Sequence, residues 1–280
     1  MKDISLEQLL EAGSHFGHQK RRWNPKMQEY VYGERDGVHI FDLVKTRDGL
    51  TQACDYVRKV VSEGGDILFV GTKRQASEIV KSEAERVGMP YVSVRWMGGL
   101  LTNFGQLSKS MKKMADLKSK KATGELMKYT KKERLLMDRE VASLEKFFGG
   151  VTNLTGLPKA IFIVDTHKEE VAVAEAAKTG VTVVGMVDSN ADPDKVDYVI
   201  PANDDAVKSI ELVVEAIAEA VEEGKKAKAE TAKKAAEAEE SKTEVKPEPE
   251  AKVVEQTEEK KAETKDKPVK KTKTKAKDES

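Results

Sequence analysis

Short, uninterrupted apolar runs alternate with amphipathic segments along the middle of the chain, and this pattern constrains the fold more than any other feature. The runs predict five β-strands, over residues 66–70, 90–94, 160–164, 181–187 and 198–200. A strand that is apolar at every position is buried on both faces, and the helical segments between the strands supply the cover. The sequence therefore predicts a doubly wound, mostly parallel α/β sheet.

Three of the expected helices carry capping-box sequences at their starts, and the first of these, Ser5-x-x-Gln8, begins a short N-terminal helix. Thr72-x-x-Gln75 follows the first strand, and Thr166-x-x-Glu169 follows the third. In a capping box, the hydroxyl and the side chain three residues later satisfy backbone N–H groups at the helix start. We therefore expect helices to begin directly after Thr72 and Thr166.

A long insertion interrupts the alternation of strands and helices. About 65 residues separate the second and third strands, far more than a crossover between parallel strands requires. Apolar residues repeat there at spacings of three and four in two blocks, Phe104, Leu107, Met111 and Met114, then Met137, Val141, Leu144 and Phe148. This spacing is typical of a coiled-coil seam and predicts an antiparallel helical hairpin over about 103–149.

The formal net charge of zero hides an uneven distribution along the chain. Residues 101–150 hold 12 basic and 6 acidic side chains, whereas residues 151–223 hold 5 basic and 15 acidic ones. Such asymmetry favours polyanion binding by one part of the surface only. The candidate RNA-binding lysines of the predicted hairpin are Lys109, Lys112, Lys113, Lys131 and Lys132.

A second basic stretch lies near the N-terminus, where the sequence also predicts a β-hairpin over residues 28–41. This stretch interleaves cations with an aromatic ring, in Lys20, Arg21, Arg22, Trp23 and Lys26. Cations neutralise phosphates, and Trp or Arg planes can stack on unpaired bases. Trp23 suits packing under a loop equally well. Arg95, which precedes Trp96, is a further candidate for RNA binding.

Several protein classes are excluded by composition. No apolar run approaches the roughly 20 residues that a membrane-spanning helix needs. The first residues contain acids and no apolar stretch, so we expect no export or organelle targeting. The lone cysteine, Cys54, lies on an apolar helical stripe, which predicts a buried thiol rather than a nucleophile. The sequence therefore predicts a cytoplasmic protein without a membrane partner.

The last 57 residues differ in composition from the rest of the chain. They contain no Phe, Tyr, Trp, Leu, Ile or Met, and 31 of them are charged. Such a segment cannot bury enough apolar surface to offset the entropy of ordering it. We expect one α/β domain over 1–223 and a charged, disordered tail over 224–280, with residues 225–240 able to extend the preceding helix.

An enzyme is the alternative interpretation. The segment FVGTKRQA, residues 69–76, resembles a phosphate-binding turn, but it lacks the glycines of the known phosphate loops. Lys73 and Arg74 are therefore assigned to RNA phosphate, and the alternative uses Lys73, Asp165 and Asp188 on a phosphorylated ligand.

Metal-binding signals are weak in this sequence. The run from Asp188 to Asp194 begins like a calcium loop, but Pro193 stands where the loop requires glycine. His15 and His18 are three residues apart and could face one metal, although no third ligand is evident. We assign no metal and no catalytic residue.

The motifs taken together resemble one family, bacterial small-subunit ribosomal protein number two. The matching segments occur in the family's order at 12–27, 40–46, 69–76, 95–104, 157–176 and 187–206. The resemblance implies a Rossmann-like (flavodoxin-like) domain with a projecting coiled-coil hairpin. It also implies a structural constituent of the small ribosomal subunit, acting in translation without catalysis, cofactor or small-molecule substrate.

The resemblance also implies particular partners. These are small-subunit rRNA and neighbouring ribosomal proteins, among them the large OB-repeat protein that binds messenger RNA. The tail after Gly224 departs from the family's shared core, so the resemblance says nothing about its role.

Overall fold

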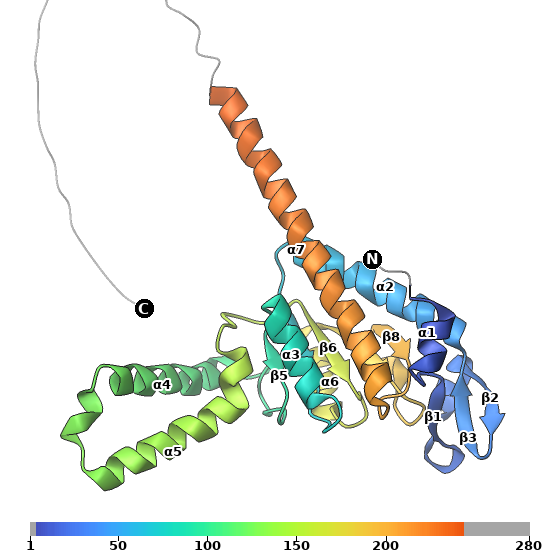
Figure 1. Ribbon diagram of the computed structural model, residues 1–280, viewed down its shortest axis with the longest axis horizontal. Helices are drawn as coiled ribbons and strands as arrows, with labels where there is room; N and C mark the ends of the chain where they lie inside the picture. Colours follow the sequence, from blue (N-terminus) through green and yellow to red (C-terminus); the bar gives the residue numbers. More distant parts are fainter. Residues whose placement is uncertain (1–3, 244–280) are drawn as a thin grey trace, which may run out of the picture. The chain divides into compact units, whose positions relative to one another are not determined.

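The computed structural model describes residues 4–243, with side chains through residue 231 (Figure 1). Most of this part belongs to one compact unit that ends at Glu237. In residues 4–243, no helix combines the length and the apolarity that crossing a membrane requires.

A five-stranded parallel sheet forms the centre of this unit. Its strands, in spatial order, are β5 (Tyr91–Val92), β4 (Ile67–Val70), β6 (Ala160–Val164), β7 (Thr182–Val187) and β8 (Tyr198–Pro201). Every residue of β4 and β6 is buried. All five predicted strands are confirmed, and β5 is the one that is markedly shorter than expected. The strand order is one that doubly wound sheets adopt.

Helices cover both faces of this sheet (Figure 1). Helices α2 (Leu43–Ser62), α3 (Ser77–Val87) and α7 (Val207–Thr243) pack on one face, around Ile67 and Phe69 of β4. Helix α6 (Glu170–Thr179) packs on the other face, with Leu68 and Val70. Alternate residues of each strand therefore enter two separate apolar layers, which explains why the strand sequences are continuously apolar.

Two of the three predicted capping boxes, those at Thr72 and Thr166, are wrong. Helix α3 begins at Ser77 and α6 at Glu170, and neither has a side-chain cap. Instead, the Thr72 hydroxyl donates a hydrogen bond to the Glu169 carboxylate. The two residues that were expected to cap separate helices thus bind each other between the ends of β4 and β6.

A small antiparallel sheet, in the same unit, precedes the parallel sheet in the sequence. Its order is β1 (Phe16–Gln19), β3 (Val38–Phe41) and β2 (Val31–Arg35). The β2–β3 pair confirms the predicted hairpin over part of its length, because residues 25–30 form a 3₁₀ helix, η2 (Pro25–Tyr30), instead of a strand. The sequence analysis missed β1, whereas the predicted N-terminal helix, α1 (Leu6–Glu11), and its Ser5–Gln8 capping box are confirmed.

The long insertion forms two helices, α4 (Phe104–Ala122) and α5 (Lys131–Phe148). The 3₁₀ turn η3 (Glu125–Lys128) joins them, and η4 (Gly149–Val151) follows α5. All eight residues of the predicted seam are buried or half-buried. Five of them, Phe104, Leu107, Met111, Leu144 and Phe148, pack against the α6 side of the sheet core. Coiled-coil packing between the two helices remains a prediction.

Helix α7 continues past the predicted domain boundary at residue 223. It runs to Thr243, as expected for the alanine- and lysine-rich segment. The Lys225 ammonium group donates hydrogen bonds to the carbonyl groups of Val87 and Gly88, so residues just beyond 223 still contact the domain. The rest of the predicted disordered tail, residues 244–280, lies outside the described residues.

Candidate nucleic-acid interface

The loop that leads into α4 is held by one buried carboxylate, Glu175 of α6. It accepts hydrogen bonds from the Trp96 indole at 3.2 Å and from the backbone N–H groups of Gly99 at 2.7 Å and Leu101 at 3.1 Å. The backbone N–H and the hydroxyl of Thr102 add two more, each at 3.2 Å. Glu175 therefore fixes the start of the inserted arm on the sheet domain.

The charge of Glu175 is stabilised in this position. Burial raises the pKa of a carboxyl group, but the hydrogen bonds from Gly99, Thr102, Trp96 and Leu101 outweigh burial. The pKa of Glu175 consequently lies below its ordinary value, and the group is ionised at neutral pH.

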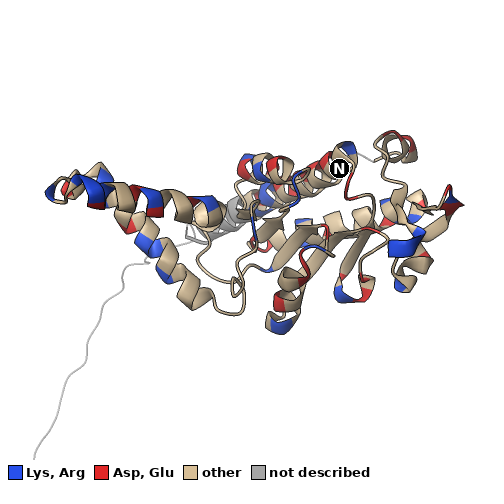
Figure 2. Ribbon diagram, turned by 90° about the horizontal axis from the view of Figure 1, so that it is seen from below, with Lys and Arg blue, Asp and Glu red and all other residues tan. Residues whose placement is uncertain are grey.

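Basic side chains follow the α4–α5 arm along most of its length (Figure 2). Three of them form ion pairs between the helices, namely Lys113 with Glu140, Lys118 with Glu145 at 2.7 Å and Lys121 with Asp138 at 2.7 Å. Within residues 103–149, all of which the structure describes, all the other lysines are exposed and have no ion pair. They are Lys109, Lys112, Lys120, Lys128, Lys131, Lys132 and Lys146.

The N-terminal basic stretch folds beside β1 and β3. Lys20, Arg21 and Arg22 form the 3₁₀ turn η1 and are exposed, and Lys20 pairs with Glu34 at 2.7 Å. The Trp23 ring stacks on His39, with 4.7 Å between the ring centroids. Trp23 is half-buried and thus serves packing in this structure, which leaves Arg21 and Arg22 as the exposed, unengaged cations of the stretch in the described residues.

Lys26 is held in local ion pairs. Its ammonium group lies 2.6 Å from Asp194 and 3.1 Å from Asp192, both near the end of β7. Hydrogen bonds to these two carboxylates raise the pKa of Lys26. A phosphate would have to compete with two carboxylates for this cation.

Lys73 is enclosed by carboxylates at the end of β4. Its ammonium group lies 2.7 Å from Asp204, 2.5 Å from Asp205 and 3.5 Å from Asp165. Burial lowers the pKa of a lysine, but the hydrogen bonds to Asp204 and Asp205 outweigh it and raise the pKa of Lys73. Its position gives no support to the predicted phosphate contact, whereas Arg74 and Arg95 are exposed.

Most of the predicted RNA-binding residues fall into two groups on different elements, and Lys73, Arg74 and Arg95 belong to neither group. The arm adjoins β5 at one edge of the large sheet, where η4 contacts β5. The N-terminal stretch lies near the opposite edge, where the backbone N–H of Asn24 donates to the carbonyl of Ser189 at 2.7 Å. Figure 1 shows the large sheet between the two groups.

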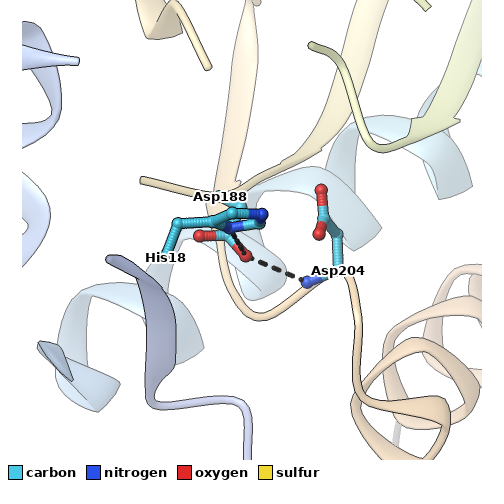
Figure 3. A group of neighbouring side chains, drawn as sticks. All are labelled: His18, Asp188 and Asp204. Atoms are coloured by element: carbon cyan, nitrogen blue, oxygen red, sulfur yellow. Dashed lines mark hydrogen bonds and ion pairs between the residues drawn. The ribbon is translucent and has the colours of Figure 1, made fainter. Parts of the chain in front are cut away.

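A cluster of polar side chains fills the space beyond the ends of β7 and β8. His18 Nδ1 lies 3.1 Å from the Asp188 carboxylate, which also accepts the Asp204 backbone N–H at 3.4 Å (Figure 3). One ligand atom from each of these three residues lies within 4.8 Å of the other two. Imidazole nitrogen and carboxylate oxygen are donors that zinc and other divalent first-row ions accept. The cluster is therefore a candidate cation site.

His15 is not part of this cluster. Its ring packs on Phe16, with 4.0 Å between the ring centroids, and burial lowers the pKa of His15. The two histidines that the sequence pairs are thus separated by the structure. Asp188 and Asp204, from the ends of two strands, join His18 instead.

Several carboxyl groups gather at this end of the sheet and influence one another. Burial raises the pKa of Asp204 to about 8, and the neighbouring charges of Asp188 and Asp165 raise it in the same direction. A hydrogen bond to Asp188 raises the pKa of His18, against the effect of burial. A phosphorylated ligand at Lys73, Asp165 and Asp188 would meet this excess of carboxylates, which opposes its binding.

Cys54 offers no nucleophile in this structure. Its side chain is fully buried on α2, and burial raises the pKa of the thiol to about 12. The thiolate that nucleophilic chemistry needs is therefore absent at neutral pH.

The sequence analysis missed two residues that organise these sites, Glu175 and Asp204. Glu175 lies in an ordinary amphipathic helix, and no local pattern marks it. Asp204 belongs to the acidic turn before α7, and the position of that turn directly after a predicted strand is the one signal that could have drawn attention to it.

Fold and surface together define an α/β domain with a cationic helical arm. The family model "Ribosomal protein S2" matches residues 9–224. Two curated relatives carry the description small ribosomal subunit protein uS2. The protein from Roseiflexus sp. (strain RS-1) is 52% identical over 221 residues, which are 79% of this chain and 84% of that protein. The protein from Corynebacterium urealyticum is 47% identical over 268 residues, which are 91% of this chain and 100% of that protein.

The chain therefore belongs to the ribosomal protein S2 family. The match covers the three-stranded sheet, the parallel sheet and the inserted arm. The family resemblance that the sequence motifs indicate is confirmed.

Proposed function

We propose that this protein is a non-catalytic structural constituent of the small ribosomal subunit in the cytoplasm and acts in translation. The main contact with rRNA is made by the α4–α5 arm, which we take to be a coiled-coil hairpin, and Arg21, Arg22, Arg74 and Arg95 are accessory contacts. Family membership supports this role, and so does the surplus of cations on the arm.

The observation that carries the RNA contact is the imbalance of charge on the arm. Three acidic residues of the arm already pair with lysines of the facing helix, yet exposed lysines without ion pairs remain on both helices. Helical arms of this kind dock on folded RNA through its shape and backbone, because phosphates carry no base code. If about six phosphates are neutralised, a threefold rise in salt should lower the affinity on the order of 100- to 1000-fold.

The test reverses four of these lysines, Lys109, Lys112, Lys131 and Lys132, to glutamate in the full-length protein. We expect the variant to fold normally and to enter small subunits poorly in sucrose-gradient fractionation. The salt dependence of its rRNA affinity should fall, because each lost phosphate contact lowers the slope by about 1.

A matched control carries the same change of charge on exposed lysines of the domain helices. Lys59, Lys81, Lys178 and Lys208 have no ion pair in the described residues, and their reversal to glutamate should leave incorporation unchanged. Normal incorporation of the arm variant, or equal loss in both variants, would remove the arm from the RNA contact.

We further propose that the protein supports docking of neighbouring small-subunit proteins, including the large OB-repeat protein that binds messenger RNA. Support comes from the family and from the acidic region 151–223, which RNA would repel. Small subunits that assemble without this chain should carry less of the OB-repeat protein, as measured by quantitative mass spectrometry of gradient fractions. Unchanged occupancy would contradict this part of the proposal.

The enzyme alternative makes a different prediction. An enzyme that acts on a phosphorylated ligand should bind nucleotides or sugar phosphates with magnesium, and calorimetry would detect micromolar affinity. We expect no heat of binding, because Lys73 is enclosed by Asp165, Asp204 and Asp205.

A further inference from the structure

The tip of the arm contains an apolar pocket beside the proposed phosphate contacts. It lies where α4, η3 and α5 meet and has a volume of about 470 Å³, within the range of ligand sites in proteins. Leu126, Met127 and Leu135 supply its apolar wall, and Lys121, Lys131 and Arg134 supply cations. The one carboxylate among its lining residues, Asp138, is already paired with Lys121.

The apolar surface at this tip is unusually open. Met127 is 75% exposed and Leu135 is 51% exposed, although both belong to ordered helical segments. Tyr129, in the same turn, is also exposed. Exposed apolar residues that gather around a pocket mark a binding surface rather than a structural one.

One of the residues that line this pocket, Arg134, has a hydrogen-bond donor without a partner. Arg134 Nε is buried from solvent and makes no hydrogen bond within the described residues, while Arg134 Nη1 contacts the sulfur of Met127 at 3.2 Å. A buried donor without an acceptor costs free energy. The pocket therefore favours an occupant that has a flat apolar surface and hydrogen-bond acceptors. Because the lining residues include cations, the occupant should also carry negative charge beside that surface.

We propose that the pocket binds one unpaired nucleotide of RNA, with its base against Leu126, Met127 and Leu135 and its acceptors facing Arg134. The flanking phosphates lie against Lys131, which has no ion pair in the described residues, rather than against Lys121, which is paired with Asp138. Unpaired bases leave the stack and insert into apolar or aromatic pockets, whereas bases in a helix are out of reach in the narrow major groove. The cations at the rim favour RNA over an apolar peptide. This inference rests on the proposed RNA-binding function and adds that the tip recognises unpaired RNA.

The test compares two synthetic RNA hairpins, identical except that one carries a bulged adenosine. A third hairpin has an abasic nucleotide at the bulge. Binding to the full-length protein is measured by fluorescence anisotropy at fixed salt. We expect the bulged hairpin to bind about fivefold or more tightly than the paired and the abasic hairpins, the lower end of what base stacking contributes.

The chain offers a closely matched pair of variants. Leu135→Ala removes part of the pocket wall, and Leu136→Ala removes a neighbouring leucine that is 55% exposed but does not line the pocket. Neither substitution changes charge, and both side chains are exposed, so the fold should be kept. We expect L135A to abolish the preference for the bulged hairpin and L136A to retain it.

The possible outcomes separate the two proposals. If the wild-type protein binds all three hairpins equally and with strong salt dependence, the RNA-binding function stands and the nucleotide pocket is wrong. If no hairpin binds, both are wrong. If L135A impairs incorporation into small subunits but keeps the preference for the bulged hairpin, the pocket holds a protein segment and the inference is overturned.

Discussion

Glu175, on α6, is the side chain that holds the loop before the arm in place. Its carboxylate accepts five hydrogen bonds, all from the segment between Trp96 and Thr102. Because backbone N–H groups of a loop need acceptors when they are buried, this one residue replaces the regular hydrogen bonding that the loop lacks. Because this loop leads directly into α4, the contact also fixes where the arm begins.

Replacing Glu175 by glutamine should destabilise the protein. The amide keeps one acceptor oxygen but directs an NH₂ group at donors, so we expect a loss of about 1.5–3 kcal/mol, the cost of charged hydrogen bonds. Urea denaturation measures this loss. Glu170→Gln, an exposed site on the same helix whose pair with Lys195 is at the surface, should change stability little. Equal stabilities of the two variants would show that Glu175 does not hold the loop.

The stability difference between wild type and E175Q should depend on pH. The pKa of Glu175 is lower in the folded protein than its ordinary value of 4.5. A carboxyl group of this kind stabilises the fold fully above pH 4.5, and the contribution is lost as pH falls through the folded-state pKa. We therefore expect the difference to be constant from pH 5 to 7 and to shrink below pH 4.5, as followed by denaturation at each pH. A difference that grows in acid would contradict the assignment.

At the scale of elements, the arm depends on the start of α5. Thr130 and Glu133 form a capping box there, since Glu133 accepts the Thr130 backbone N–H at 2.9 Å and Thr130 accepts the Glu133 N–H at 3.4 Å. This box borders the apolar pocket, because Lys131 and Arg134 belong to the same turn. Loss of the cap would loosen both the helix start and the pocket.

Thr130→Ala should raise amide hydrogen exchange in the first turn of α5 by about two- to thirtyfold, the range expected for losing a cap. Exchange in the sheet strands should stay as in the wild type. Thr123→Ala is the control, because its hydroxyl donates to the Lys120 carbonyl at 3.3 Å and caps no helix start. Faster exchange throughout the sheet would mean that the arm and the domain open together.

At the scale of the whole molecule, the boundary between domain and tail can be located by truncation. Gly224 lies against α2 so closely that a Cβ atom would be 2.8 Å from the Arg58 carbonyl oxygen, and Lys225 binds the end of α3. A chain that ends at Glu223 loses both contacts. A chain that ends at Thr243 keeps them and loses the segment whose composition predicts a disordered tail.

We expect truncation after Thr243 to leave the melting temperature unchanged. Truncation after Glu223 should lower it by about 2–4 °C for each kcal/mol lost, in a chain of this size. Differential scanning calorimetry measures the melting temperatures of both truncated proteins and of the full-length chain. A large drop for the longer chain would show that residues 244–280 contribute to the folded state.

How much could be foreseen differs between the apolar and the polar parts of the chain. Apolar runs and helical spacing predict the five strands of the large sheet and both helices of the arm, because burial acts on local periodicity. Strand β1 was missed, since Phe16–Gln19 is short, polar and depends on pairing with β3 for its existence. The predicted RNA contacts of Arg21, Arg22 and the arm lysines remain predictions, and those of Lys26 and Lys73 face competition from carboxylates distant in sequence.

The sequence by itself determines where this chain is apolar, where it is helical and where its charge accumulates, because each of these follows from neighbouring residues. Only the tertiary structure decides which polar groups meet. Thr72 and Glu169, 97 residues apart, bind each other instead of capping their own helices. His18 lies beside Asp188 and Asp204, and His15 is not part of that group. The carboxyl ends of parallel strands lie at the same end of the sheet, however far apart the strands are in the sequence. The order of the strands therefore decides which polar side chains become neighbours there.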